Sequence, residues 1–149
     1  MVNIMKELEL EEKKGDLQVE IESFIRKYYF LKNVNFYINV AMIIGSLSLA
    51  AIVSYASFTR DSYLAGVLSI ALFFLISINN AFSTGEKAEF YQFIVVESEN
   101  LLSTLKFEED DFNTILKKFL IIRESAAKSI PRGRGMGIIK DIYKDLKQL

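Results

Sequence analysis

Two long stretches of this chain contain no charged side chain. The first runs from residue 33 to residue 59 and the second from residue 62 to residue 85, with only Arg60-Asp61 between them. Each stretch holds about 20 or more mostly apolar residues, which is the length that an α-helix needs to cross the hydrocarbon core of a bilayer. The pattern predicts two transmembrane helices, near residues 36–58 and 63–82, joined by a tight turn.

A pair of core helices in a soluble bundle is the alternative interpretation of the same pattern. Helices of a soluble bundle keep a polar, usually charged, face toward water. Neither stretch has a charged face. The absence of charge over this length therefore favours insertion into a membrane.

Basic residues flank the predicted hairpin on one side. Arg26, Lys27 and Lys32 precede the first span and Lys87 follows the second, whereas the turn carries one arginine with an aspartate beside it. The positive-inside rule then predicts that both termini lie in the cytoplasm and that the turn lies outside. Because the connection is so short, the two helices should be antiparallel neighbours.

The segments on either side of the hairpin also show helical periodicity. We expect a single all-α domain over residues 1–149, with a cytoplasmic N-terminal helix over residues 1–32, a transmembrane hairpin over 33–85 and a cytoplasmic helical tail over 86–149. Apolar residues recur at helical spacing before and after the hairpin, which predicts amphipathic helices there. Gly15-Asp16 is a candidate break before the first of these helices.

Small and polar residues lie on more than one side of the predicted spans. Small residues let helices approach closely in lipid, where packing and hydrogen bonds drive association. Joining the two helices of one hairpin accounts for one face of each, so the pattern predicts a homo-oligomer. The candidate pore-lining or helix-packing residues are Gly45, Ser46, Ala50, Ser54, Ser69, Ser77 and Asn80.

The residue types that usually carry catalysis are scarce. The chain has no His and no Cys, which removes the commonest general base, the thiol nucleophile and the soft metal ligands. We therefore expect no enzyme activity, no cofactor and no metal. A net charge of −1 gives no reason to expect nucleic-acid binding.

Two arginines in the glycine-rich segment after Pro131 are a further candidate site. Arg132 and Arg134 could contact an anion or a lipid headgroup. A flexible basic turn is the simpler interpretation of such a short pattern.

The exit from the second predicted span carries a short motif, Phe82-Ser83-Thr84-Gly85-Glu86-Lys87-Ala88. Together with the order of helix, two-span hairpin and long helical tail, this motif resembles the SLATT domain, a two-transmembrane module of bacterial conflict systems. Family members show a similar aromatic-x-x-Gly-Glu-Lys-Ala start to the helix after the second span. They often carry His a few residues later, where this chain has Phe90-Tyr91-Gln92.

The resemblance implies an oligomeric pore or ion channel that permeabilises the bacterial inner membrane in antiviral defence. It also implies a cytoplasmic partner, such as a nucleotide-sensing or other sensor protein, in addition to membrane lipid and further copies of the chain. The candidate motif or gating residues that follow from it are Phe82, Gly85, Glu86, Lys87 and Ala88.

Two other functions remain open from the sequence. One is a non-conducting membrane anchor or adaptor that scaffolds a cytoplasmic partner. The other is a holin-like phage protein, which would favour a shorter chain with a basic tail. The tail here is long and mixed in charge.

Overall fold

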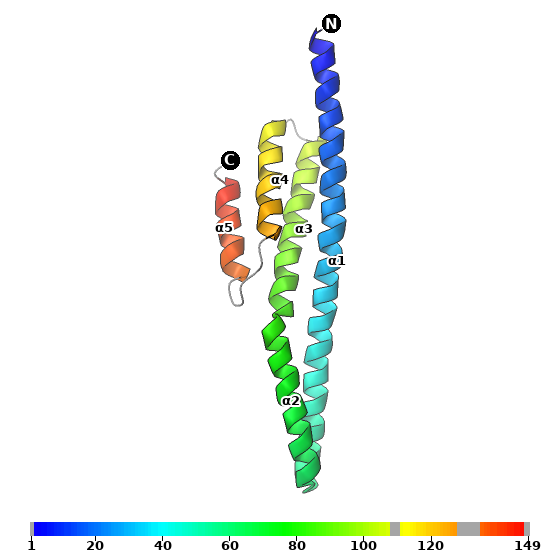
Figure 1. Cartoon of the computed structure of the whole chain (residues 1–149), viewed down its shortest axis with the longest axis vertical. Helices are drawn as coiled ribbons and strands as arrows, with labels where there is room; N and C mark the ends of the chain where they lie inside the picture. Colours follow the sequence, from blue (N-terminus) through cyan, green and yellow to red (C-terminus); the bar gives the residue numbers. More distant parts are fainter. Residues whose placement is uncertain (1, 108–110, 128–134, 148–149) are drawn as a thin grey trace. The chain divides into compact units, whose positions relative to one another are not determined.

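The protein is built of α-helices throughout the part of the chain that the structure describes. This structure, a computed structural model, describes residues 2–107, 111–127 and 135–147. The helices are α1 (Val2–Phe58), α2 (Ser62–Phe82), α3 (Thr84–Phe107), α4 (Phe112–Ala127) and α5 (Gly135–Lys147) (Figure 1). The all-α class expected from the sequence is confirmed.

The chain forms two compact units. The first, which we call the helical body, combines Met1–Lys32 with Glu89–Leu149. The second, which we call the hairpin, is Asn33–Ala88. The long helix α1 therefore contributes to both units.

The helical body has a continuous hydrophobic core to which α1, α3, α4 and α5 all contribute. Apolar residues recur every three or four positions on each helix, so each helix presents one apolar stripe to the others. The buried residues of this core are Leu17, Ile21, Tyr28, Phe90, Ile94, Val95, Leu101, Ile115, Phe119, Ile122 and Ile142.

Aromatic rings connect the helices of the body. The ring of Phe24 on α1 meets Phe119 on α4 edge to face, with 5.4 Å between ring centroids. Tyr28 on α1 lies 5.6 Å from Tyr91 on α3. Such pairs add about 0.5–1.5 kcal/mol each beyond the area that they bury. They join sequence segments that are far apart, and so they help to specify how α3 and α4 pack against α1.

Polar contacts at the edge of this core satisfy the buried tyrosine and add ion pairs. The Tyr28 hydroxyl donates to the Ala126 carbonyl oxygen at 3.3 Å, and burial raises the pKa of this tyrosine. Lys106 Nζ lies 3.0 Å from Glu22 Oε1, and the hydrogen bond from this lysine lowers the pKa of Glu22. Because the Lys106–Glu22 pair is partly exposed, its contribution to stability is small.

One local prediction was wrong. Gly15 does not break the first helix, since α1 is continuous from Val2 to Phe58. Glycine in a helix interior costs only about 1 kcal/mol relative to alanine, and the packed turns that follow from Leu17 onward offset this cost. Helix α5 begins at Gly135, and residues 128–134 before it lie outside the described part of the chain.

We predict that Phe119→Ala strongly destabilises the helical body. Phe119 is fully buried, so its truncation should lower the free energy of unfolding by about 3–5 kcal/mol. Chemical denaturation in mild detergent, followed by far-UV circular dichroism, would measure this change. Phe107→Ala is the matched control, because Phe107 is 83% exposed and its removal should change the free energy by about 0.5 kcal/mol or less. Equal effects of the two variants would contradict the packing described here.

Candidate membrane hairpin

The turn of the hairpin is stabilised by backbone capping at both helix ends. Arg60 has a positive φ of 63°, and the amide of Asp61 donates to the Ala56 carbonyl at 3.0 Å, as in a Schellman motif. The Asp61 carboxylate then accepts from the Leu64 amide at 3.1 Å and caps α2. Arg60 and Asp61, the two charged residues between the helices, thus both take part in helix capping.

The two helices of the hairpin pack along one narrow seam. On α1 the positions that are at least half-buried include 35, 39, 42, 46, 49, 53 and 56, and on α2 they include 65, 68, 72, 75 and 79. These spacings alternate between three and four residues, which is the repeat of a left-handed coiled coil. A Cβ added at Gly45 would lie 3.5 Å from Leu75 Cδ2, an ordinary van der Waals contact, so these two positions face each other across the seam.

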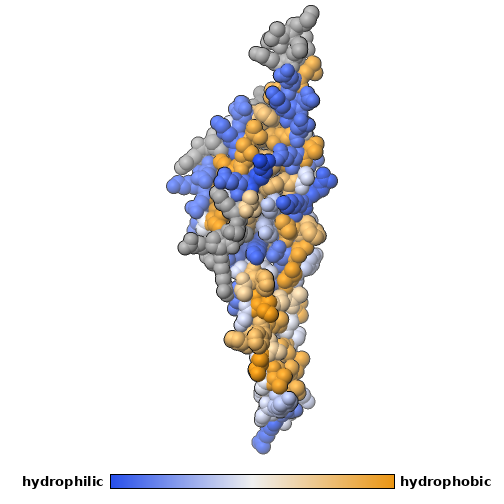
Figure 2. Space-filling view, viewed as in Figure 1, coloured by the Kyte–Doolittle hydropathy of each residue, from blue (hydrophilic) through white to orange (hydrophobic). Residues whose placement is uncertain are grey.

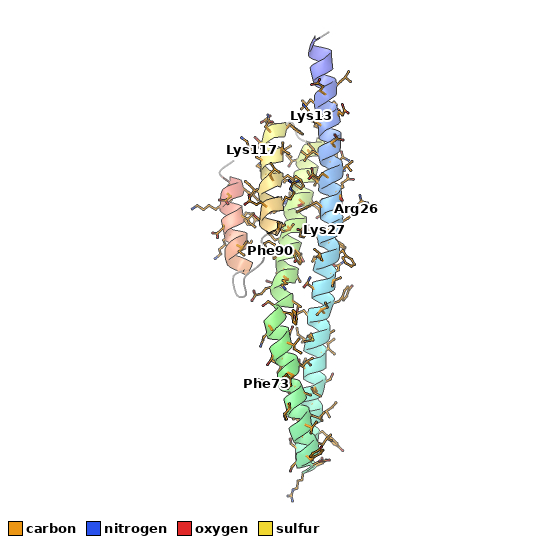
Figure 3. The ribbon with its side chains drawn as sticks, in the orientation of Figure 1. Lys13, Arg26, Lys27, Phe73, Phe90 and Lys117 are labelled. Carbon is orange, nitrogen blue, oxygen red and sulfur yellow. The ribbon has the colours of Figure 1, made fainter. Side chains whose placement is uncertain are left out.

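The rest of the hairpin surface is apolar and exposed. None of the residues of α2 is buried, and large aliphatic and aromatic side chains project along both helices. Figure 2 shows this hydrophobic surface along α2 and the adjoining part of α1, with hydrophilic residues at the turn. Phe73 on α2 is 68% exposed, whereas Phe90 on α3 in the helical body is completely buried (Figure 3).

Two helical segments are long and apolar enough to cross a membrane. They are Leu8–Phe58 and Ser62–Phe107, and the apolar window of neither segment is buried inside the protein. A core helix of a soluble protein would instead bury most of such a window. This exposed apolar surface is therefore the feature that distinguishes the hairpin from the helical body.

A polar cluster lies at the end of the hairpin opposite the turn. The Thr84 hydroxyl lies 3.4 Å from Asn39 Oδ1 and 3.3 Å from Asn79 Oδ1, so it joins the two helices and the start of α3. Thr84 is only 7% exposed. Ser83, with φ 48° and ψ 42°, ends α2 in the left-handed conformation just before this threonine.

Gly85 lies close to Asn39 in the same cluster. A Cβ at this position would lie 3.3 Å from Asn39 Nδ2, which is tighter than most side-chain contacts. The absence of a side chain thus lets the Asn39 amide lie against the first turn of α3. This is a packing reason for the glycine that the sequence motif contains.

Two of the predicted site serines, Ser54 and Ser69, bond to carbonyl groups of their own helices. Ser54 Oγ donates to the Ala50 carbonyl at 2.9 Å, and Ser69 Oγ donates to the Ala65 carbonyl at 2.7 Å. A serine bonded in this way leaves no unsatisfied donor and is compatible with a lipid-facing position. It is equally compatible with a helix–helix contact.

The structure divides the predicted site residues between the seam and the outer surface. Half-buried positions are Gly45, Ser46, Ala50 and Ser77, and exposed positions are Ser54, Ser69 and Asn80. In the motif after α2, Phe82 is exposed, Gly85, Glu86 and Lys87 are half-buried, and Ala88 is buried. Arg132 and Arg134 lie outside the described residues.

Two features of the hairpin were not recognised from the sequence. The first is the seam, whose alternation of three- and four-residue steps is readable once the two antiparallel helices are aligned. The second is the meeting of Asn39, Asn79 and Thr84. The sequence did contain a signal for this contact. A short turn places the start of the first predicted span beside the end of the second, and each of these ends carries an asparagine.

We predict that the double variant Gly45→Cys with Leu75→Cys forms a disulfide on oxidation, because these positions face each other across the seam. The chain has no native cysteine, so free thiols counted with a maleimide reagent would report the cross-link directly. Leu47→Cys with Leu75→Cys is the control, since Leu47 is 66% exposed. Efficient cross-linking of the control pair alone would contradict the register.

No family profile, curated protein sequence or solved structure matches this chain.

Proposed function

We propose that the hairpin inserts into a bilayer as two antiparallel spans and anchors the helical body to the membrane. The exposed apolar surface of the hairpin carries this proposal. At the centre of a span, each Leu, Ile, Phe or Val contributes about −0.3 to −0.6 kcal/mol to insertion, whereas one Asp, Lys or Arg costs about 2.5–3.5 kcal/mol. Residues 36–58 and 63–82 hold many of the former and none of the latter, so the sum favours lipid.

The proposed orientation places both termini in the cytoplasm. Arg26, Lys27, Lys32 and Lys87 flank the two spans on the side of the termini. Bases near the ends of spans remain on the cytoplasmic side during insertion. The turn at Arg60-Asp61 is then the only part of the hairpin that is exposed on the opposite side.

On this anchor we propose a pore-forming function, in which several copies assemble and permeabilise the bacterial inner membrane in a conflict or antiviral response. Two observations support it. The motif from Phe82 to Ala88 resembles the start of the third helix in SLATT proteins, and Ser54, Ser69 and Asn80 are exposed on the hairpin rather than used in its seam. A two-helix hairpin cannot enclose a pathway alone, so a pore requires further copies of the chain. A cytoplasmic sensor protein is the proposed trigger.

A non-conducting anchor is the second candidate, and one observation favours it. The hydroxyls of Ser54 and Ser69 already bond to their own helix backbones, so they need neither a water-filled lumen nor a partner helix. In that case the helical body would be a platform for a cytoplasmic partner. The holin-like function has no structural observation of its own in its favour.

The orientation predicts opposite labelling of two engineered cysteines. Thr59→Cys in the turn should react with a membrane-impermeant maleimide in intact spheroplasts. Phe107→Cys in the helical body should react only after the membrane is permeabilised, because both positions are exposed on the protein and only the bilayer separates them from the reagent. Labelling of both before permeabilisation would contradict the topology.

The pore predicts release of a trapped dye from liposomes that contain the purified protein. Ser69→Leu and Ser77→Leu should each reduce the release severalfold if their face lines the pathway. Ser57→Leu, in the last turn of α1, is the matched control and should leave the release unchanged. Absence of leakage from the wild-type protein under every condition would exclude the pore and leave the anchor. Unchanged release in both variants would show that this face does not line the pathway.

A further inference from the structure

A groove opens on the hairpin near the end opposite the turn. It encloses a volume of about 370 Å³, and residues from α1, α2 and the start of α3 line it. Its apolar lining is Ile38, Met42, Ile78 and Phe82, and its polar lining is Asn35, Asn79, Thr84 and Lys87. All of these residues belong to the hairpin unit.

The charged residue of the lining lies at one end of the groove. On α1 the order toward the turn is Asn35, Ile38 and Met42. On α2 and the start of α3 the order away from the turn is Ile78, Asn79, Phe82, Thr84 and Lys87. At about 1.5 Å per residue, the seven positions from Asn35 to Met42 span about 10 Å. The end of the groove away from the turn thus carries Asn35 and Lys87, and apolar side chains line both of its sides nearer to the turn.

We propose that this groove binds an anionic phospholipid, with the phosphate at Lys87 and an acyl chain along Ile38, Met42 and Ile78. The proposal rests on the insertion of the hairpin, which places the groove where headgroups meet acyl chains. There the polar end faces the cytoplasmic headgroups and the apolar end faces the hydrocarbon. An amphiphile with one negative group matches this order of side chains.

Charge favours an anionic over a zwitterionic lipid. The ion pairs between side chains of the described residues are Lys106–Glu22 and Arg123–Glu20. Lys87 belongs to neither pair. It is the only basic residue of the hairpin besides Arg60, which lies in the turn at the other end. Glu86 does not line the groove.

Size favours a lipid chain over a helix of another protein. The volume lies in the lower part of the range of small-molecule sites, which is about 300–1,000 Å³. A helix with its side chains is about 10 Å wide and would need a longer and wider groove. A single acyl chain with its phosphate is therefore the occupant that suits both the shape and the charge.

Native mass spectrometry of protein extracted from mixed vesicles tests the proposal. The vesicles contain phosphatidylcholine with a minor fraction of phosphatidylglycerol, and the measurement counts each lipid retained per chain. The wild-type protein should retain phosphatidylglycerol in preference to phosphatidylcholine. Lys87→Gln should lower this preference about fivefold, the effect of one lysine near an anionic surface. Lys117→Gln, on the exposed face of α4 (Figure 3), makes the same change of charge and should leave the preference unchanged.

A second pair of variants tests the apolar end. Met42→Trp fills the groove and should reduce retention of both lipids, whereas Ile43→Trp, at a neighbouring exposed position that does not line the groove, should not. Equal retention by wild type and Lys87→Gln would overturn the proposal even if Met42→Trp failed to fold.

Flotation of the vesicles after an alkaline wash separates this proposal from the proposed function. A wild-type chain that does not float would overturn both insertion and the lipid site. A chain that floats but shows no preference for phosphatidylglycerol would overturn the lipid site alone.

Discussion

A pair of packed helices can bury only one stripe of each helix, and the rest of the hairpin depends on this constraint. The seam uses every third or fourth residue from Asn35 to Ala56 and from Ala65 to Asn79. The other positions must face something else, and many of them carry large apolar side chains. Water solvates such a surface poorly, because each exposed apolar Å² costs about 25 cal/mol relative to an apolar environment. Lipid or further copies of the chain are the surroundings that remove this cost.

The helical body solves the same problem within the chain. The seam spacing is already present in the first part of α1, at Leu17, Ile21, Phe24 and Tyr28. In the body, however, α3 and α4 lie against this stripe, and charged residues occupy the outer faces. The aromatic contact of Phe24 with Phe119 and the hydrogen bond of Tyr28 to Ala126 join distant segments into one core. The two units therefore share the same repeat of apolar residues. They differ in the residues on the opposite face of each helix, which are often charged in the body and mostly apolar in the hairpin.

The two ends of α2 depend on left-handed residues that are not glycine. Arg60 closes the turn and Ser83 ends α2 before the polar cluster. L-residues adopt this conformation at some cost, which the surrounding hydrogen bonds of Asp61 and Thr84 offset. The break at Ser83 also brings the first turn of α3, with Thr84 and Lys87, against the end of the hairpin. Both residues line the groove that we propose for a lipid.

The sequence alone determined the all-α class, the two apolar helices and the short turn between Phe58 and Ser62, because charge distribution and helical period are local properties. The sequence also shows that Asn39 and Asn79 lie at the end of the hairpin opposite the turn, and that small residues occur along both helices. Only the tertiary structure decided which of them meet. Gly45 faces Leu75, and Thr84 joins Asn39 to Asn79. These contacts depend on the register of antiparallel helices and on the left-handed backbone of Ser83. The continuity of α1 through Gly15 was likewise decided by packing, since the core that begins at Leu17 outweighs a local preference of about 1 kcal/mol.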